Sequence, residues 1–239
     1  MPEAQAGRGR LIALEGIDGA GTTTQARLLA DWLSDHGAPA SLTREPSGGP
    51  LGLLLRDILS HRTREVDRAA LALLFAADRL DHLAAEVEPL LGRGGHVVTD
   101  RYVYSSLAYQ SMDLDLPWVA AINRRAPEPD LTIYLRVDPA VAARRRSTRD
   151  RQAEVFETNA EQQRIASIYD AFFGSTAAAG SWRLDPGGSD WIPVDPARIR
   201  PELGRVGRAP CWAVVDGEQP VDHVHSRLKK LVRKICPVT

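Results

Sequence analysis

A glycine-rich stretch, GIDGAGTTTQ at residues 16–25, has the spacing of a phosphate-binding loop, G-x-x-x-x-G-K-[ST]. Its glycines would let backbone N–H groups face phosphate oxygens, and the helix expected to follow would add its N-terminal dipole. Thr23 stands where a hydroxyl would bind Mg²⁺. The loop predicts a donor-phosphate site formed by Gly16, Gly19, Ala20, Gly21, Thr22, Thr23 and Thr24. The alternative is a glycine turn without a ligand.

The lysine of this motif is missing, because Thr22 occupies its position. In phosphoryl transfer that lysine places a positive charge on the β- and γ-phosphates. Loss of one preorganised donor costs on the order of 10²–10³ in rate. We expect binding to suffer less, since the loop amides, the helix terminus and Mg²⁺ remain. The lysines of the chain, Lys229, Lys230 and Lys234, lie near its other end, so no lysine nearby in sequence can supply this charge.

Two further pairs of residues could act on an acceptor. In TDRYVYSSLAYQ, residues 99–110, Asp100 and Arg101 follow a predicted strand, where open α/β sheets bind their ligands. Asp100 could hold Mg²⁺ through water and Arg101 could hold a second phosphate; a surface ion pair is the alternative. Phe75 and Arg79 share one helical face at i, i+4 spacing, which suits a base and a phosphate. Their alternative is a core phenylalanine beside a solvated arginine.

Short apolar strands that alternate with helical segments must position these residues. Strands are predicted at 11–14, 40–43, 96–99, 131–135 and 212–215. Helices are predicted from the glycine loop to about residue 36, and at 51–59, 68–91 and 221–235. This alternation predicts an α/β fold, in which helices cover both faces of a parallel sheet of about five strands.

The overall composition is that of a soluble globular protein. The chain has 239 residues, of which 44% are hydrophobic and 26% are charged, and its net charge is −1. It therefore has no overall basic field that would attract nucleic acid or an anionic membrane. No apolar run reaches the roughly 18 residues of a membrane span, and we expect a cytoplasmic protein. Cys211 and Cys236 have no CxxC partner, which argues against a structural zinc site or a disulfide framework.

Residues 174–210 interrupt the alternation, because they are rich in Gly, Pro and Ala. Residues 182–192 could form a hairpin around the turn-forming residues PGGS. We interpret 174–210 as a surface insertion. A lid extension or an assembly element is the alternative, because its two tryptophans would be awkward to leave exposed.

Six stretches, in order, resemble the thymidylate kinase (dTMP kinase) family, of the bacterial type with arginines in its lid. They are EGIDGAGTTTQ, TREPSGGPLG, LLFAADRLDHL, TDRYVYSSLAYQ, PEPDLTIYLRVDP and the arginine-rich run before VFE. The resemblance implies a P-loop nucleoside-monophosphate-kinase fold, as a single domain over 1–239 with a lid at 143–157 and the insertion at 174–210. It also implies a homodimeric phosphotransferase that moves a phosphoryl group from ATP to dTMP with Mg²⁺, and no nucleic-acid or membrane partner.

The resemblance gives each site residue an expected role. Asp18 would lie near the 3′-hydroxyl of the acceptor, Arg44 would contact its phosphate and Phe75 would stack on thymine. The rest of the acceptor pocket would comprise Arg79, Arg101, Ser105, Ser106, Tyr109 and Gln110. Thr23 and Asp100 would bind Mg²⁺, Asp100 through water. The expected catalytic residues are Asp18, Arg101, Arg146, Arg149 and Arg151, of which the last three belong to a lid run that also holds Arg144 and Arg145.

The sequence departs from the family pattern at three places. Ser47 replaces a usual glycine in TREPSGG, residues 174–210 have no counterpart in compact members, and Thr22 replaces the lysine. We hypothesise that a lid arginine supplies the missing charge, because a guanidinium can bind phosphate in bidentate geometry. Two other functions stay open: a diverged kinase of another small molecule or nucleotide, and a catalytically impaired nucleotide-binding pseudokinase. The chain keeps the acceptor-side residues, and an enzyme that had lost its activity would have no reason to keep them. Their presence favours a dTMP kinase.

Overall fold

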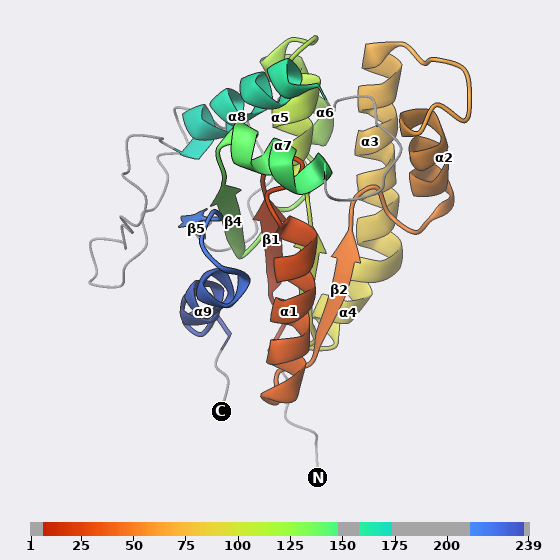
Figure 1. Ribbon diagram of the computed structural model, residues 1–239. Helices are drawn as coiled ribbons and strands as arrows, with labels where there is room; N and C mark the ends of the chain where they lie inside the picture. The colour runs from red at the N-terminus through yellow and green to blue at the C-terminus, as the bar shows by residue number, and fades with distance from the viewer. Residues whose placement is uncertain (1–6, 148–157, 174–210, 237–239) are drawn as a thin grey trace.

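Five parallel strands form one sheet in the part of the chain that the structure describes. The structure is a computed structural model, and it describes residues 7–147, 158–173 and 211–236 (Figure 1). The strands are β1 (Leu11–Glu15), β2 (Ala40–Arg44), β3 (His96–Asp100), β4 (Leu131–Arg136) and β5 (Cys211–Asp216). Their order is β2-β3-β1-β4-β5, so β1 is central and pairs with β3 and β4. The predicted α/β fold with a parallel sheet of about five strands is confirmed.

Helices cover both faces of this sheet (Figure 1). In chain order they are α1 (Thr22–Asp35), α2 (Pro50–Leu59), α3 (Arg68–His82), the π-helical turn η1 (Leu83–Val87), α4 (Glu88–Gly92), α5 (Val103–Gln110), α6 (Leu116–Asn123), α7 (Pro139–Ser147), α8 (Asn159–Phe173) and α9 (Val221–Val232). The helix α1 packs on β1, β2 and β3 and against α9, while α8 packs on β4 and against α5. The helix expected at 68–91 is divided into α3, η1 and α4, because the π-helical turn interrupts its regular hydrogen bonding.

The central strands are buried on both faces, as parallel strands between helix layers must be. Every residue of β1, LIALE, is buried, and so are the first five residues of β4. The edge strand β2 is only partly covered, and its Leu42 is 44% exposed. The sequence pattern follows from this burial, because only a strand covered on both faces reads as a continuous apolar run.

The carboxyl ends of β1, β2 and β3 meet at one edge of the sheet. Asp100, the last residue of β3, is in register with Arg44 of β2 on one side and with Leu14 of β1 on the other. Gly19 and Gly21 of the loop after β1 have φ values of 91° and 96°, a backbone conformation that favours glycine. Arg101, directly after β3, also has a positive φ, of 72°, although it carries a side chain. Backbone strain of this kind occurs at functional sites, so this edge is where a site is expected.

Two sequence predictions lie wholly or partly outside the described residues. Of the lid expected at 143–157, the structure describes only 143–147, which end α7. The insertion expected at 174–210, with its hairpin, falls on residues that are not described. In the described part of the chain, none of the helices combines the length and the apolar character needed to cross a membrane.

Candidate active site

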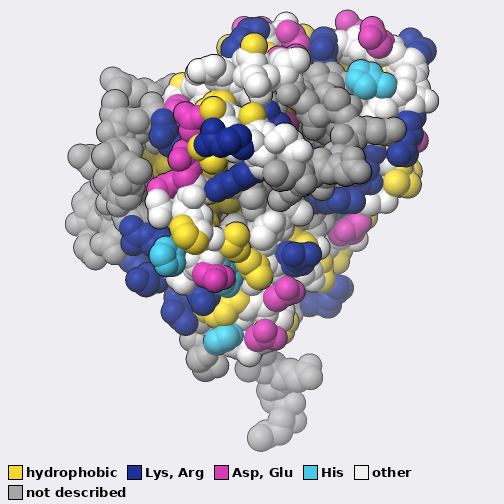
Figure 2. All heavy atoms as spheres, in the orientation of Figure 1, with side chains coloured by type: hydrophobic (Ala, Val, Ile, Leu, Met, Phe, Trp, Pro, Cys, Tyr) yellow, Lys and Arg dark blue, Asp and Glu magenta, His cyan; other side chains and the backbone are white. Residues whose placement is uncertain are grey.

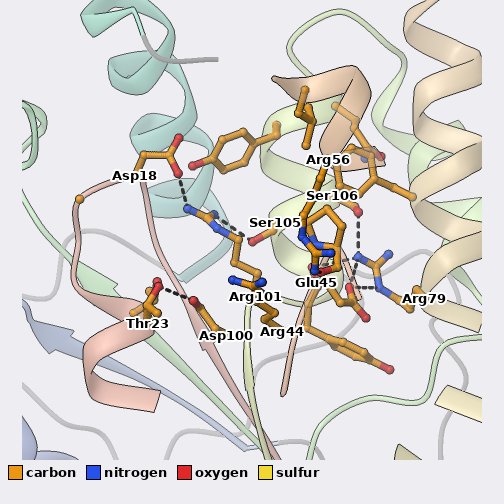
Figure 3. Close-up of a pocket in the computed structure, with 18 of the residues that line it drawn as sticks. Asp18, Thr23, Arg44, Glu45, Arg56, Arg79, Asp100, Arg101, Ser105 and Ser106 are labelled. Atoms are coloured by element: carbon orange, nitrogen blue, oxygen red, sulfur yellow. Dashed lines mark hydrogen bonds and ion pairs between the residues drawn. The ribbon is translucent and has the colours of Figure 1, made fainter. Parts of the chain in front are cut away.

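A pocket of about 580 Å³ opens at the carboxyl edge of the sheet (Figure 3). The structure brings most of the sequence-predicted site residues into its wall. These are Asp18, Gly19, Gly21, Thr22, Thr23, Arg44, Phe75, Arg79, Asp100, Arg101, Ser105, Ser106, Tyr109, Gln110 and Arg146. Gly16, Ala20 and Thr24 do not line it, and Arg149 and Arg151 lie outside the described residues. The glycine loop and the acceptor-side residues thus share one cavity.

Thr23 and Asp100 form a pair on the floor of this pocket. The Thr23 hydroxyl donates a hydrogen bond of 2.5 Å to Oδ2 of Asp100 (Figure 3). The Asp100 side chain is buried, and its Oδ1 has no hydrogen-bond partner among the described residues. A buried carboxylate oxygen without a partner is costly unless a ligand satisfies it. The pair fits Mg²⁺, which is usually held by one or two carboxylates together with phosphate oxygens and water.

Asp18 of the glycine loop and Arg101, directly after β3, form an ion pair in the pocket wall. Arg101 Nη2 lies 2.6 Å from Oδ1 of Asp18 (Figure 3). Arg101 Nη1 donates to the carbonyl of Gly16 at 2.9 Å. The Arg101 guanidinium also lies 5.0 Å from the centre of the Tyr109 ring. Arg101 therefore joins β3 to the glycine loop, and its charge is held in a fixed place between the two halves of the pocket.

Arg79 lies in the pocket wall with its guanidinium already paired. Its Nη2 is 2.6 Å from Oε2 of Glu45, and the same group donates to Ser106 Oγ at 2.9 Å (Figure 3). Arg79 Nη1 also donates to Oδ1 of Asn123. Only 2% of Arg79 is exposed, so a ligand would meet an arginine whose charge is balanced by Glu45. This position suits recognition of a neutral base better than neutralisation of a phosphate.

The net positive charge of the pocket comes from a different set of arginines. Arg44, Arg56 and Arg146 all line it, whereas Arg101 is paired with Asp18. Arg56 Nη2 donates to the carbonyls of Pro46 and Ser47, both at 2.7 Å. Burial and the nearby charge of Arg44 lower the pKa of Arg56. A phosphate would relieve this repulsion.

Two pocket residues could recognise a nucleobase. Phe75 of α3 is partly buried and lines the pocket. Gln110 ends α5, and its buried Oε1 has no hydrogen-bond partner in the part of the chain that the structure describes. That oxygen can accept a hydrogen bond from an N–H of a base, while an aromatic ring can stack on its face.

Comparison with known proteins decides the family. The model of the thymidylate kinase family matches residues 14–178. The chain belongs to the thymidylate kinase family. A thymidylate kinase from Synechococcus sp. (strain RCC307) is 35% identical over 239 residues, which span 95% of this chain and 97% of that protein. A protein from Aeropyrum pernix, provisionally named a thymidylate kinase, is 45% identical over 172 residues, or 72% of this chain and 82% of the relative.

A solved thymidylate kinase, from Candida albicans, has the same fold. It superposes with a TM-score of 0.69 at 24% identity, and the match covers 95% of this chain and 92% of that one. The two chains therefore share their fold.

Some residues at this pocket were not predicted from the sequence. Gln162 of α8 is buried, accepts from the backbone N–H of Asp18 at 2.9 Å and donates to Oδ2 of Asp18 at 2.7 Å. Glu15 is buried at the end of β1 and accepts hydrogen bonds from Tyr102 N–H, Ser105 and Tyr169. Glu15 does stand directly before the glycine loop, but an acid at the end of an apolar strand gives no clear signal by itself.

Two arginines of α7 donate to backbone carbonyls, one in the glycine loop and one directly after β5. Arg146 Nη1 donates to the carbonyl of Asp18 at 2.6 Å, and its Nη2 donates to Asn159 Oδ1 at 3.2 Å. Arg145 Nη1 donates to the carbonyl of Gly217 at 2.9 Å. Figure 2 shows basic side chains on the surface over α7. Three consecutive arginines thus begin the segment that was expected to form the lid.

Proposed function

We propose that this chain transfers the γ-phosphoryl group of ATP to dTMP, giving dTDP and ADP. One observation carries the proposal: the phosphate-binding loop and a base-recognition wall line the same pocket, with arginines between them. In-line phosphoryl transfer needs a donor and an acceptor held end to end, with positive charge at the position where they meet.

The acceptor half would hold a pyrimidine monophosphate. Phe75 would stack on thymine, Gln110 Oε1 would accept its N–H, and Arg79 would complete the base pocket from its pair with Glu45. Arg44 and Arg101 would bind the phosphate, while Asp18 would accept a hydrogen bond from the 3′-hydroxyl. Tyr109 and Ser105 would close the pocket from α5.

The donor half would hold ATP on the glycine loop. Backbone N–H groups of Gly19, Gly21 and Thr22 stand at the N-terminus of α1, where an anion is stabilised. Mg²⁺ would be held by Thr23 and Asp100, and it would supply positive charge to the donor phosphates.

We further propose that Arg146 supplies the charge that Thr22 lacks. Arg146 lines the pocket, and its guanidinium already contacts the loop at the Asp18 carbonyl. A rotation about its side-chain torsions would let the same guanidinium reach a phosphate bound by that loop. Arg149 and Arg151 stay predictions for the same role, as does the assignment of the lid to the bacterial type.

A coupled ADP-release assay tests both proposals. We expect turnover with dTMP, and a loss on the order of 10²-fold in kcat for Arg146→Ala, as for removal of one preorganised donor. Thr22→Lys should restore much of that loss in the double variant, because it returns a cation to the same phosphates. Arg93→Ala, which removes an exposed arginine at the end of α4, is the matched control and should be silent.

Other outcomes would favour the other functions. Tight dTMP binding without turnover, even after Thr22→Lys, would identify a nucleotide-binding pseudokinase. Turnover only with another monophosphate would identify a diverged kinase. A large gain from Thr22→Lys alone, with Arg146→Ala silent, would show that Arg146 does not supply the charge.

We also propose that the chain forms a homodimer through α3. The exposed side of α3 and η1 carries Ala70, Leu73, Ala77, Leu80 and Ala84 at alternating spacings of three and four residues. Leu73 is 50% exposed and Leu80 is 37% exposed. A stripe of alternating small and large apolar side chains suits packing against a second copy of itself about a two-fold axis.

The cytoplasm remains the expected location of the protein.

A further inference from the structure

Ser47 lies at the centre of a buried hydrogen-bond network beside the pocket. Its hydroxyl donates to Oδ1 of Asp78 at 2.6 Å, and its backbone N–H donates to Oδ2 of Asp78 at 2.8 Å. Ser47 and Asp78 are each 1% exposed. The carboxylate of Asp78 therefore finds a partner for both of its oxygens in one residue of the loop after β2.

The same hydroxyl also fixes the next turn of the chain. Ser47 Oγ accepts a hydrogen bond from the backbone N–H of Gly49 at 3.0 Å, directly before α2 begins. Gly52, in the first turn of α2, packs so closely on the Ser47 backbone that a Cβ there would lie 2.2 Å from the Ser47 carbonyl oxygen. Ser47 therefore joins the loop to α3 and to the start of α2.

The network borders the acceptor pocket without entering it. Neither Ser47 nor Asp78 lines the cavity, whereas Arg44, Glu45 and Pro46, the three residues before Ser47, all do. Arg56 binds the carbonyls of Pro46 and Ser47, so its guanidinium depends on where this loop lies. Asp78 precedes Arg79, whose ion pair with Glu45 spans the same two segments.

We propose that Ser47 is a positioning residue for the acceptor. By satisfying both oxygens of Asp78, it holds residues 44–49 in the binding geometry before the acceptor arrives. The arginine side of the pocket is therefore built in advance, and binding does not have to order it. A glycine at this position would keep the backbone N–H bond, but it would leave Oδ1 of Asp78 and the Gly49 N–H without this partner.

The kinetic test rests on the proposed dTMP kinase function. Ser47→Ala and Ser47→Gly are compared with the unmodified chain, and the glycine variant restores the residue usual in the family, so it should fold. We expect the KM for dTMP to rise about tenfold, while the KM for ATP and kcat stay within about twofold. A fall in kcat with both KM values unchanged would indicate lost active protein, and would overturn the proposal.

Ser34→Ala is the matched control. The Ser34 hydroxyl bridges the backbone carbonyl and N–H of Ala40, at 3.2 and 3.1 Å, at the opposite end of β2 from the pocket. The Ser34→Ala change removes a local side-chain bridge at an exposed position, and it should leave the KM for dTMP unchanged. An equal rise in KM for Ser34→Ala and Ser47→Ala would contradict a specific role of Ser47.

A second measurement does not depend on the proposed function. Hydrogen exchange of the unliganded protein, read on peptides covering residues 44–52, should be about tenfold faster in Ser47→Ala than in the unmodified chain. Peptides from β4 should exchange at the same rate in both. Unchanged exchange at 44–52 would overturn the proposal, whether or not the chain phosphorylates dTMP. Faster exchange in a chain without dTMP turnover would count against the proposed function alone.

Discussion

Glu15 is a carboxylate with no exposed surface, and it acts on the pocket through its neighbours. Ser105 donates to Glu15 and accepts a hydrogen bond from Arg101 Nη1 at 3.2 Å. Burial raises the pKa of Glu15 above its ordinary value of 4.5, although the hydrogen bond from Ser105 and the charge of Arg101 oppose the rise. The folded protein therefore binds this proton more tightly than the unfolded chain does.

A pH-dependent stability difference follows from this pKa. Because the folded-state value is raised, the contribution of Glu15 to stability is largest below pH 4.5 and is lost as the pH rises through the folded pKa. Glu15→Gln removes this titration. The free energy of unfolding of the variant, minus that of the unmodified chain, should therefore increase between about pH 4 and pH 7.

Urea denaturation at both pH values measures this difference. Glu65→Gln, at an exposed position, is the control for the loss of one carboxylate outside the pocket. If the Glu15→Gln difference does not change with pH, burial does not raise the pKa of Glu15.

The chemistry of single residues could be predicted where a motif is continuous in sequence. Asp18, Thr23, Asp100 and Arg101 were expected in a site, and all four line the pocket. The partners that orient them come from far along the chain. Gln162 is 144 residues from Asp18, and local spacing carries no trace of such a contact. Ser47 was noted only as a substitution, because its partner Asp78 lies 31 residues away.

The helix α3 brings Phe75, Asp78 and Arg79 to the acceptor side, so its first turn matters to the site. Asp67 is its N-cap. Oδ1 of Asp67 accepts from the backbone N–H groups of Ala69 and Ala70, at 2.9 and 3.1 Å. These N–H groups have no partner within the helix, which is why a capping side chain stabilises it.

Asp67→Ala should lower the free energy of unfolding by about 1 kcal/mol. Asp67→Asn keeps an acceptor oxygen and should retain most of the stability. Chemical denaturation of the two variants under the same conditions makes the comparison. A loss as large in Asp67→Asn as in Asp67→Ala would assign the effect to something other than the cap.

Whole elements could be predicted from sequence where burial imposes a simple pattern. The five strands were placed to within two residues. The pattern is clearest in the three central strands, because both faces of a central parallel strand must be apolar. The helix α7 gave no such pattern, since two of its arginines, Arg145 and Arg146, donate hydrogen bonds to backbone carbonyls. The π-helical turn after α3 was also missed, because one added residue per turn barely changes a helical periodicity.

At the scale of the whole molecule, the stripe on α3 makes a prediction about assembly. The variant with both Leu73→Asp and Leu80→Asp should be a monomer, because it would bury two carboxylates against their symmetry mates. Light scattering after size-exclusion chromatography measures the mass of each form. Val221→Asp changes a residue of similar exposure at the start of α9, and it should leave the dimer intact. A monomeric unmodified chain at micromolar concentration would contradict the proposed interface.

The strand β1 leaves the ribosome long before either of its neighbours. Leu11 pairs with Val97, and Ile12 pairs with Leu131. At roughly 5–20 residues per second, synthesis needs on the order of ten seconds to reach β4. During that interval LIALE is an apolar segment without its partner strands. Chaperones bind segments of this kind, and two unfinished chains can pair through them. We therefore expect the yield of folded protein in a cell to depend on how quickly translation delivers β3 and β4.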